Sequence, residues 1–217
     1  MKPCAVGSFK EGEYKIRRKH RKHRQWRERK HHFGEMIQMD GSHHNWLEER
    51  GPNLVLMGYI DDATNNVFAR FYNYEGTFPA MDSFKRYIQC YNIPQSIYLD
   101  KHTTYRSTRK LTLQEELQGL IKPMSQFERA LNELEVEIIY ANSPQAKGRI
   151  ERLFKTFQDR LIKEMRLANV SSKEKANSFL KDYLLIYNKR FSVVSAKETN
   201  LHREVPKEID LDSIFSS

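Results

Sequence analysis

Leu54-Val-Leu-Met-Gly-Tyr-Ile60 and Val67-Phe-Ala-Arg-Phe-Tyr72 are the stretches of this 217-residue chain that decide its fold. Both are short, apolar and rich in β-branched or aromatic side chains, which is typical of buried strands. The residues between them, Asp61-Asp-Ala-Thr-Asn-Asn66, are turn formers. The pattern predicts a β-hairpin over residues 54–72, with Asp61 and Asp62 capping its turn.

Outside the hairpin, two more strands are expected, and each ends on an acid. Met36-Ile-Gln-Met-Asp40 comes before the hairpin, and Ser96-Ile-Tyr-Leu-Asp100 comes after it. Residues 77–92 have apolar side chains at helical spacing, with Thr77 as the expected cap and Pro79 in the first turn. A hairpin followed by alternating strands and helices favours a mixed sheet flanked by helices.

The second half of the chain continues this alternation. Helices are expected at residues 125–134 and 172–189, a strand at 136–140, and a shorter helix near 114–120. A turn at 142–148 leads into a long amphipathic helix, whose apolar face holds Ile150, Leu153, Phe154, Phe157 and Leu161. We expect these phenylalanines to be core residues, and the chain after residue 196 to be a polar tail.

The net charge of +9 is concentrated at the N-terminus. Residues 1–34 hold 12 Lys or Arg and 3 Asp or Glu, whereas the remainder holds 25 of each sign. A basic segment on a neutral body indicates a polyanionic partner, usually DNA or RNA; a solvated linker is the alternative. The expected phosphate contacts are Arg17, Arg18, Arg21 and Arg24, and such binding weakens steeply with salt. Trp26 either stacks on a base or packs on the body.

Several classes of protein are excluded by the composition. Cys4 and Cys90 form no motif, so no disulfide framework is expected and a reducing compartment is the default. No apolar run reaches the roughly 18–20 residues of a membrane span, and the N-terminus has no apolar signal-peptide core. The histidines between residues 20 and 32 have no Cys-x-x-Cys partner, so zinc is not expected. We expect a cytoplasmic protein.

Two strand-end acids and one helix acid form the candidate active site. If the strands of Asp40 and Asp100 are parallel neighbours, both carboxylates emerge at one sheet edge, where a nearby helix start brings in Glu151. Three such carboxylates repel one another unless cations neutralise them, and oxygen ligands favour Mg²⁺ or Mn²⁺ over Zn²⁺. Paired ions of this kind support phosphoryl transfer. By spacing alone, surface acids at strand ends are the favoured alternative, because the chain has 28 acids.

The residues around each acid resemble one family. Asn142-Ser-Pro-Gln-Ala-Lys-Gly-Arg-Ile-Glu-Arg152 is similar to the segment around the third acid of retroviral-integrase-like transposases. Met36-Ile-Gln-Met-Asp-Gly-Ser42 and Gly58-Tyr-Ile-Asp-Asp-Ala-Thr64 resemble the first hairpin of that family, and Ile97-Tyr-Leu-Asp100 its second-acid strand.

Further motifs narrow the resemblance to the ISNCY-type bacterial insertion-sequence transposases, over roughly residues 15–205. These motifs are Gln126-Phe-Glu-Arg-Ala-Leu131, Gln158-Asp-Arg-Leu161 and Tyr187-Asn-Lys-Arg190. Many relatives follow the second acid with Asn-Gly, whereas Lys101-His102 stands here, a variation compatible with this subgroup. His43 and His44 follow the first acid and are expected either to be solvated or to meet DNA near the metals.

The resemblance implies an α/β, RNase H-like fold (the integrase catalytic core), with a five-stranded mixed sheet flanked by helices. It carries Asp40, Asp100 and Glu151 over as a DDE triad that binds Mg²⁺, with Mn²⁺ as a substitute. The implied activity is metal-dependent cleavage of transposon ends and strand transfer into target DNA, by a homo-oligomer assembled on DNA at the bacterial nucleoid. The implied DNA contacts are Lys155 and Gln158, on the face of Glu151, together with Lys147 and Arg152.

Three segments are expected along the chain. They are a basic, DNA-contacting linker (1–34), the integrase catalytic core (35–193) and a C-terminal tail (194–217). Relatives carry a helix-turn-helix domain before the linker and a small β-rich domain after the core, and we expect neither in this chain. A truncated, non-catalytic DNA-binding remnant is therefore the alternative to an active core, and a stand-alone RNase H-type nuclease is a third possibility.

Overall fold

The computed structural model describes residues 28–100, 104, 105, 107, 111, 113, 117, 123–141 and 148–216. Several predictions fall outside these residues. They concern Arg17, Arg18, Arg21, Arg24, Trp26, Lys147 and most of the helix expected near 114–120.

Five strands and five α-helices make up the described part of the chain. The strands are β1 (Ile37–His44), β2 (Leu54–Asp61), β3 (Val67–Tyr72), β4 (Ser96–Leu99) and β5 (Glu137–Tyr140). The helices are α1 (Thr77–Tyr91), α3 (Gln126–Glu133), α4 (Gly148–Leu167), α5 (Lys173–Phe191) and α6 (Leu211–Ile214), with a 3-10 helix η1 at Glu48–Arg50. Within these residues, no helix has the length and apolar character needed to cross a membrane.

The strands form one mixed sheet in the order β3-β2-β1-β4-β5. β1, β2 and β3 pair antiparallel, so the predicted hairpin is confirmed, whereas β1, β4 and β5 pair parallel. The expected five-stranded mixed sheet flanked by helices is therefore correct. β1 is the centre of the sheet and the only described strand with an antiparallel neighbour on one side and a parallel neighbour on the other.

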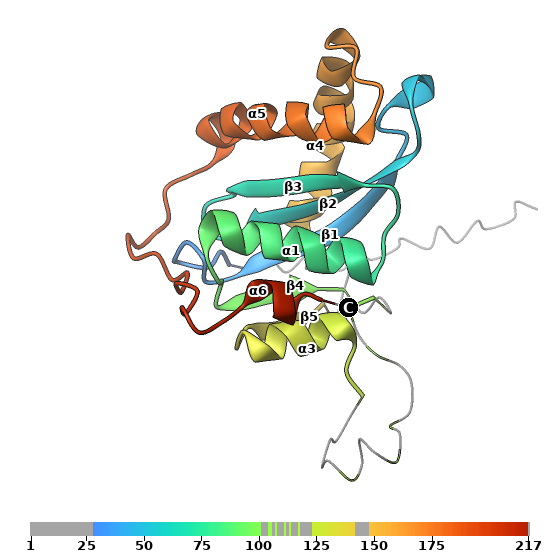
Figure 1. Ribbon diagram of the computed structural model, residues 1–217. Coiled ribbons are helices and arrows are strands. Elements are labelled where there is room, and N and C mark those ends of the chain that lie inside the picture. The colour runs from blue at the N-terminus through green and yellow to red at the C-terminus, as the bar shows by residue number, and fades with distance from the viewer. Residues whose placement is uncertain are drawn as a thin grey trace, which may run out of the picture.

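Alternation along the strands gives the sheet two apolar faces. On one face, residues such as Met39, Met57 and Leu99 join a core with α1 and α3. On the other face, residues such as Leu56 and Phe71 pack against α4 and α5. Figure 1 shows these two helical layers on opposite sides of the sheet. Phe154 and Phe157 of α4 are buried in the second core, as the sequence predicts.

The element boundaries differ from the prediction in two informative places. β1 continues to His44 because it stays paired with β2, His44 facing Leu54, after β4 has ended. The N-cap of α1 is Gly76, which has no capping side chain, so Thr77 is not the cap. Two serines do cap helices: the Ser125 side chain forms a capping box with Glu128 at the start of α3, and the Ser172 side chain accepts a hydrogen bond from the Lys175 backbone N–H at the start of α5.

The chain after residue 196 lies on the body and contains α6, so the expectation of a polar tail is wrong for this stretch. Arg203 forms a β-bridge with Ile93, and Ile214 of α6 is buried in the first core. His202 packs so closely on Gly34 that a Cβ there would lie 2.3 Å from the ring, and Gly34 has a φ of +79°. Burial lowers the pKa of His202 to about 4. The division of the chain at residues 34 and 194 stays a prediction.

Candidate active site

Asp40 and Asp100 lie level with each other on neighbouring parallel strands. β1 pairs with β4 at Ile37 with Ile97 and at Gln38 with Tyr98, and the same offset carries Asp40 to the level of Asp100. Side chains two residues apart share a face, so both acids lie on the face opposite Met39 and Leu99. Both residues are half-buried.

The prediction of two strand-end acids is therefore half right. Asp100 directly follows β4, as expected, whereas Asp40 stands inside β1, opposite Gly58 of β2. Asp40 lies where β4 ends while β1 continues, because β2 supplies backbone partners beyond that point. The end of the shorter strand leaves the edge of β1 at Asp40 accessible beside Asp100.

Glu151 lies on α4, which runs alongside β1 on the face that carries Asp40. At one end, Arg149 contacts Asp62 (Nη1 to Oδ1, 3.0 Å), and Asp62 also accepts a hydrogen bond from Gln38 (2.9 Å). At the other end, Gln158 donates to Ser42 Oγ (3.4 Å). The helix rises about 13 Å from Arg149 to Gln158, and the strand rises about 13 Å from Gln38 to Ser42. The two elements therefore run nearly parallel.

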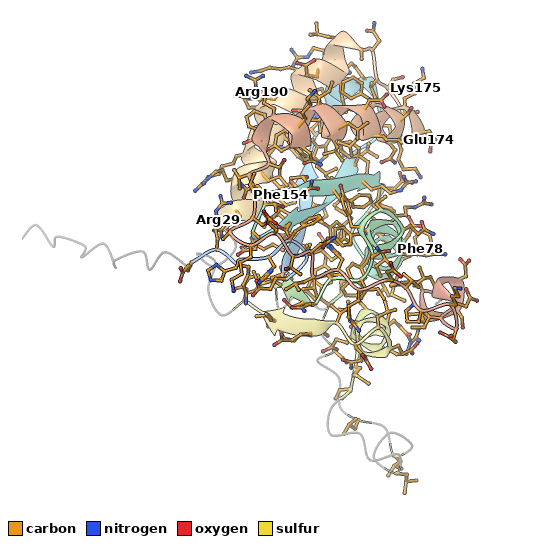
Figure 2. The ribbon with its side chains drawn as sticks, turned by 90° about the vertical axis from the view of Figure 1, so that its left-hand side faces the viewer. Arg29, Phe78, Phe154, Glu174, Lys175 and Arg190 are labelled. Atoms are coloured by element: carbon orange, nitrogen blue, oxygen red, sulfur yellow. The ribbon has the colours of Figure 1, made fainter. Side chains whose placement is uncertain are left out.

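This arrangement puts Glu151 between the levels of Gln38 and Asp40, because two helical residues beyond Arg149 add about 3 Å and two strand residues beyond Gln38 add about 7 Å. The contact between helix and sheet is tight here. A Cβ on Gly58, the partner of Asp40, would lie 2.7 Å from the Phe154 ring. Figure 2 labels Phe154 where α4 meets the sheet. Glycine at position 58 thus allows α4 to approach the strand of the first acid.

The described residues include no three His, Cys, Asp or Glu side chains close enough to hold one metal ion together. Asp40 and Asp100 are level on adjacent strands, whereas the Glu151 side chain is exposed to solvent. The oxygen donors of these residues are those that Mg²⁺ prefers. The backbone thus brings the three elements to one edge, and the residue types there fit a hard cation.

A fourth carboxylate, Glu75, lies on the opposite face of β1 and was not singled out by the sequence. A Cβ on Gly41 would lie 2.6 Å from the Glu75 carboxyl carbon. Glu75 accepts a hydrogen bond from the Tyr105 hydroxyl (3.0 Å) and contacts His43 Nε2 (2.7 Å). Burial, followed by the nearby Glu75, holds the pKa of Tyr105 well above its ordinary value. The one feature of the sequence that could have indicated this contact is Gly41, directly after Asp40.

The adjacent acids Asp61 and Asp62 have different roles. Asp61 caps the hairpin turn through the backbone N–H and hydroxyl of Thr64, as predicted, and burial raises its pKa. Asp62 does not have the predicted role. Fully buried, it accepts hydrogen bonds from the Lys30 backbone N–H, from Gln38 and from Arg149. It therefore ties the incoming N-terminal segment and the first turn of α4 to β1.

The predicted DNA-contacting residues of α4 separate onto two flanks of the helix. Lys155 and Gln158 follow Glu151 by four and seven residues and share its flank. Arg152 lies on the other flank, where it lines a cavity of about 270 Å³ with Arg29, Arg149 and Arg160. Arg152 lies away from the flank of Glu151 because one residue along a helix turns the side chain by about 100°, and its role as a phosphate contact stays a prediction.

Two bacterial transposases are similar to this chain in sequence. One is the putative transposase y4bF of Sinorhizobium fredii (strain NBRC 101917 / NGR234), 39% identical over 188 residues, which cover 86% of this chain and 40% of the relative. The other is the transposase for insertion sequence IS1202 of Streptococcus pneumoniae, 33% identical over 168 residues, covering 76% of this chain and 34% of the relative. The chain thus spans about two fifths or less of these relatives. No family model matches the sequence.

Solved structures of retroviral integrases share the fold. The integrase catalytic core of HTLV-2, solved in complex with magnesium, matches with a TM-score of 0.54 at 16% identity, covering 77% of this chain and 94% of that one. A chain of the simian T-cell lymphotropic virus intasome, in complex with a PP2A regulatory subunit, matches with a TM-score of 0.59 at 18% identity, covering 84% and 59%. At such low identity, these likenesses establish the fold only.

By fold, the molecule is a retroviral-integrase-like catalytic core with an RNase H-like sheet. By sequence, the chain belongs with the DDE-type transposases, as a core related to the two bacterial transposases above. The narrower resemblance to the ISNCY-type transposases stays a prediction.

Proposed function

We propose that this chain is the catalytic core of a transposase that carries out metal-dependent DNA cleavage and strand transfer. One observation carries the proposal: Asp40 and Asp100 stand level on adjacent parallel strands, and the helix of Glu151 runs along the same face. The kinship with bacterial transposases supports the DNA substrate. Because the chain covers about two fifths of the first relative, the activity of a whole transposase is part of this proposal.

Each acid has a distinct task in the proposed reaction. Asp40 and Asp100, on the rigid sheet, would hold Mg²⁺ or its substitute Mn²⁺ from one side, and Glu151 would complete the ligand set from α4. When bound, these ions supply electrostatic stabilisation of the attacking and leaving oxygens. The protein contributes position, since two ligands sit on paired strands and the third on a helix packed against them.

Lys155 and Gln158 are proposed to orient the DNA end. Both lie on the flank of Glu151, and Gln158 reaches Ser42, two residues beyond Asp40 on the same face of β1. Lys155 is exposed and free to meet a phosphate as a point charge. On the other face, Glu75 contacts His43 and lies against Gly41, which supports the backbone next to the first acid.

We further propose that the protein acts on DNA as a homo-oligomer in the bacterial cytoplasm, at the nucleoid. The structural neighbours include an integrase core solved as a dimer and an integrase chain within an intasome. Two transposon ends must be joined in one event, which favours an assembly with more than one active site. The bacterial origin of the sequence relatives supports the compartment.

The test is strand transfer by the full 217-residue chain, using a 3′-ended DNA oligonucleotide with Mg²⁺ or Mn²⁺. The wild type is expected to join the oligonucleotide to a target duplex, and Glu151→Gln to give only the level of a protein-free reaction. Lys181→Gln, a charge change on the exposed face of α5, serves as the matched control and is expected to retain activity. Equal joining by wild type and Glu151→Gln would refute the assignment.

A wild-type chain that folds and binds DNA but joins nothing would instead identify it as a non-catalytic remnant. Circular dichroism and DNA binding of the same preparations establish that the proteins are folded. An RNA–DNA hybrid in a parallel reaction checks the nuclease alternative, and cleavage of its RNA strand in preference to DNA joining would count against the transposase.

A further inference from the structure

The flank of α4 that faces away from the candidate active site forms a separate basic groove. We name it the arginine groove and define it by four arginines and the polar and aromatic residues between them. The lining residues are Arg29, Asn65, Arg149, Arg152, Thr156, Arg160, Tyr187 and Phe191. An adjoining hollow of about 250 Å³ extends it along α5 past Lys163 and Arg190.

The groove gathers positive charge without matching acids. Among the described residues that line the cavity, there are four arginines and no Asp or Glu. Arg149 does pair with Asp62, but that carboxylate is fully buried beneath the groove and already serves two other donors. The adjoining hollow contains Asp159 and Glu164, and Asp159 is paired with Lys163. Clustered guanidinium groups of this kind stabilise a bound anion.

Aromatic side chains hold part of the charge in place. The guanidinium carbons of Arg160 and Arg190 lie 5.5 Å and 5.4 Å from the centre of the Phe191 ring. Stacking on a ring orders the guanidinium but leaves its N–H donors free for oxygen acceptors. Arg152 and Arg160 are exposed, so their donors face solvent. These planar guanidinium groups are preorganised to donate paired hydrogen bonds to oxygen anions such as phosphates.

The length of the groove favours a polymer over a single phosphate ion. From Arg149 to Arg160, the helix rises about 16 Å, close to the rise of five base pairs along one DNA strand. Arg29 lines the groove and belongs to residues 1–34, where 12 Lys or Arg outnumber 3 Asp or Glu. Figure 2 shows Arg29 and Arg190 on the same side of the molecule as α4. Arg29 is thus an arginine of the basic segment that also lines the groove.

We propose that the arginine groove binds the phosphate backbone of duplex DNA, separately from the carboxylate flank. This inference rests on the proposed function in taking DNA as the substrate and extends it with a second contact surface. DNA held there would lie along the outer side of α4, while the reacting end meets Glu151 on the inner side. Phosphate contacts of this kind position DNA without reading its sequence.

Binding of a fluorescent 30-base-pair duplex to the full chain, followed by anisotropy over a NaCl series without divalent metal, tests the proposal. The double variant Arg152→Gln/Arg160→Gln is expected to bind at least roughly tenfold more weakly at 0.1 M salt. The slope of log affinity against log salt should fall by about 1.8, because each lost phosphate contact removes about 0.9. The matched control, Lys181→Gln/Lys189→Gln, removes the same charge from exposed positions of α5 outside the groove.

Two outcomes would overturn the proposal: wild-type affinity and slope in the arginine variant, or an equal loss in the lysine control.

Strand transfer at saturating DNA keeps this inference distinct from the proposed function. The arginine variant should regain joining at high DNA concentration, since its carboxylates are intact, whereas Glu151→Gln should bind with the wild-type slope and join nothing. Joining by Glu151→Gln would remove the catalytic proposal and leave the groove standing. Wild-type binding by the arginine variant would remove only the groove.

Discussion

The two flanks of α4 differ in what they face and in the charge they carry. The inner flank holds Glu151, Lys155 and Gln158 and lies along β1, where Gln158 reaches Ser42. The outer flank holds Arg149, Arg152 and Arg160 and faces the N-terminal segment and the end of α5. The apolar side chains of α4 lie between the two flanks and pack into the core, so the flanks belong to two separate surfaces. Residues that are neighbours in the sequence of α4 therefore belong to two different surfaces, because the helix turns them to opposite flanks.

The largest expected effect comes from Asp62, which anchors both flanks at their common start. Asp62→Ala leaves Arg149, whose side chain is 16% exposed, without its carboxylate, and also removes the acceptor of Gln38 and the Lys30 N–H. Breaking a buried pair in this way costs about 3–5 kcal/mol of unfolding free energy. Urea denaturation measures the loss.

Asp159→Ala is the matched control, because it removes a carboxylate whose pairing with Lys163 is solvent-exposed. The expected change there is small, because solvent screens an exposed ion pair. Similar losses in the two variants would show that Asp62 is not an anchor, and the two flanks would then have to be regarded as independent.

The packing of His202 on Gly34 sets the pH range in which the stabilities of variants on the two flanks can be compared. Its pKa is lowered from 6.5 to about 4 in the folded chain by burial. Between these values, the unfolded chain binds more protons, so stability is full above pH 6.5 and falls as the pH drops toward 4. The loss at this site is below about 3 kcal/mol, because solvent screens this half-buried group.

Urea denaturation of wild type and His202→Gln at pH 7 and pH 4.5 tests this contribution of His202 to stability. The wild type should lose more unfolding free energy than the variant over this interval. A parallel decline in the two proteins would mean that His202 does not contribute, and that other groups cause any acid sensitivity.

Gly58 tests the inner flank alone. In Gly58→Ala, the new methyl group meets the Phe154 ring at 2.7 Å, so α4 must shift away from the strand of Asp40. The expected cost is about 1–3 kcal/mol, with reduced strand transfer. Adding Phe154→Leu should recover part of both, because the two positions are in contact. Strictly additive losses would contradict this close packing, and DNA binding by the arginine groove should be unchanged throughout.

The smallest expected effect on stability is at Gln158, whose hydrogen bond to Ser42 is long at 3.4 Å. Gln158→Ala should change the unfolding free energy by less than about 0.5 kcal/mol. Strand transfer should nevertheless fall roughly tenfold, the effect of one lost contact to a charged phosphate. Thr156→Ala, two residues away on the outer flank, is the comparison and should leave joining intact at saturating DNA. Equal activity in both variants would remove Gln158 from the site.

The sequence predicted the elements well where local signals agree. The hairpin at residues 54–72, the helix expected over residues 125–134 and the apolar face of α4 follow from periodicity and turn chemistry, which act over a few residues. The parallel neighbours β1 and β4 were a conditional expectation, and the observed pairing satisfies it.

Other features depend on contacts between distant parts of the chain, and local patterns do not contain them. Glu75 meets Gly41 and Tyr105 across gaps of some thirty residues, and Asp62 joins β1 to a helix that begins 86 positions later. The packing of His202 on Gly34 holds the polar C-terminal segment against the folded core. Burial, which only the assembled fold defines, gives these polar groups their roles.

By itself, the sequence determined the residue types: two acids on strands and one acid on a helix, each tied to its element by short-range periodicity, and a basic N-terminal segment. The tertiary structure decided how they combine. The offset between β1 and β4 makes Asp40 level with Asp100, and packing at Gly58 brings α4 alongside. The turn of the helix then assigns Glu151 to one surface and Arg152 to another, because neighbours in a helix point about 100° apart.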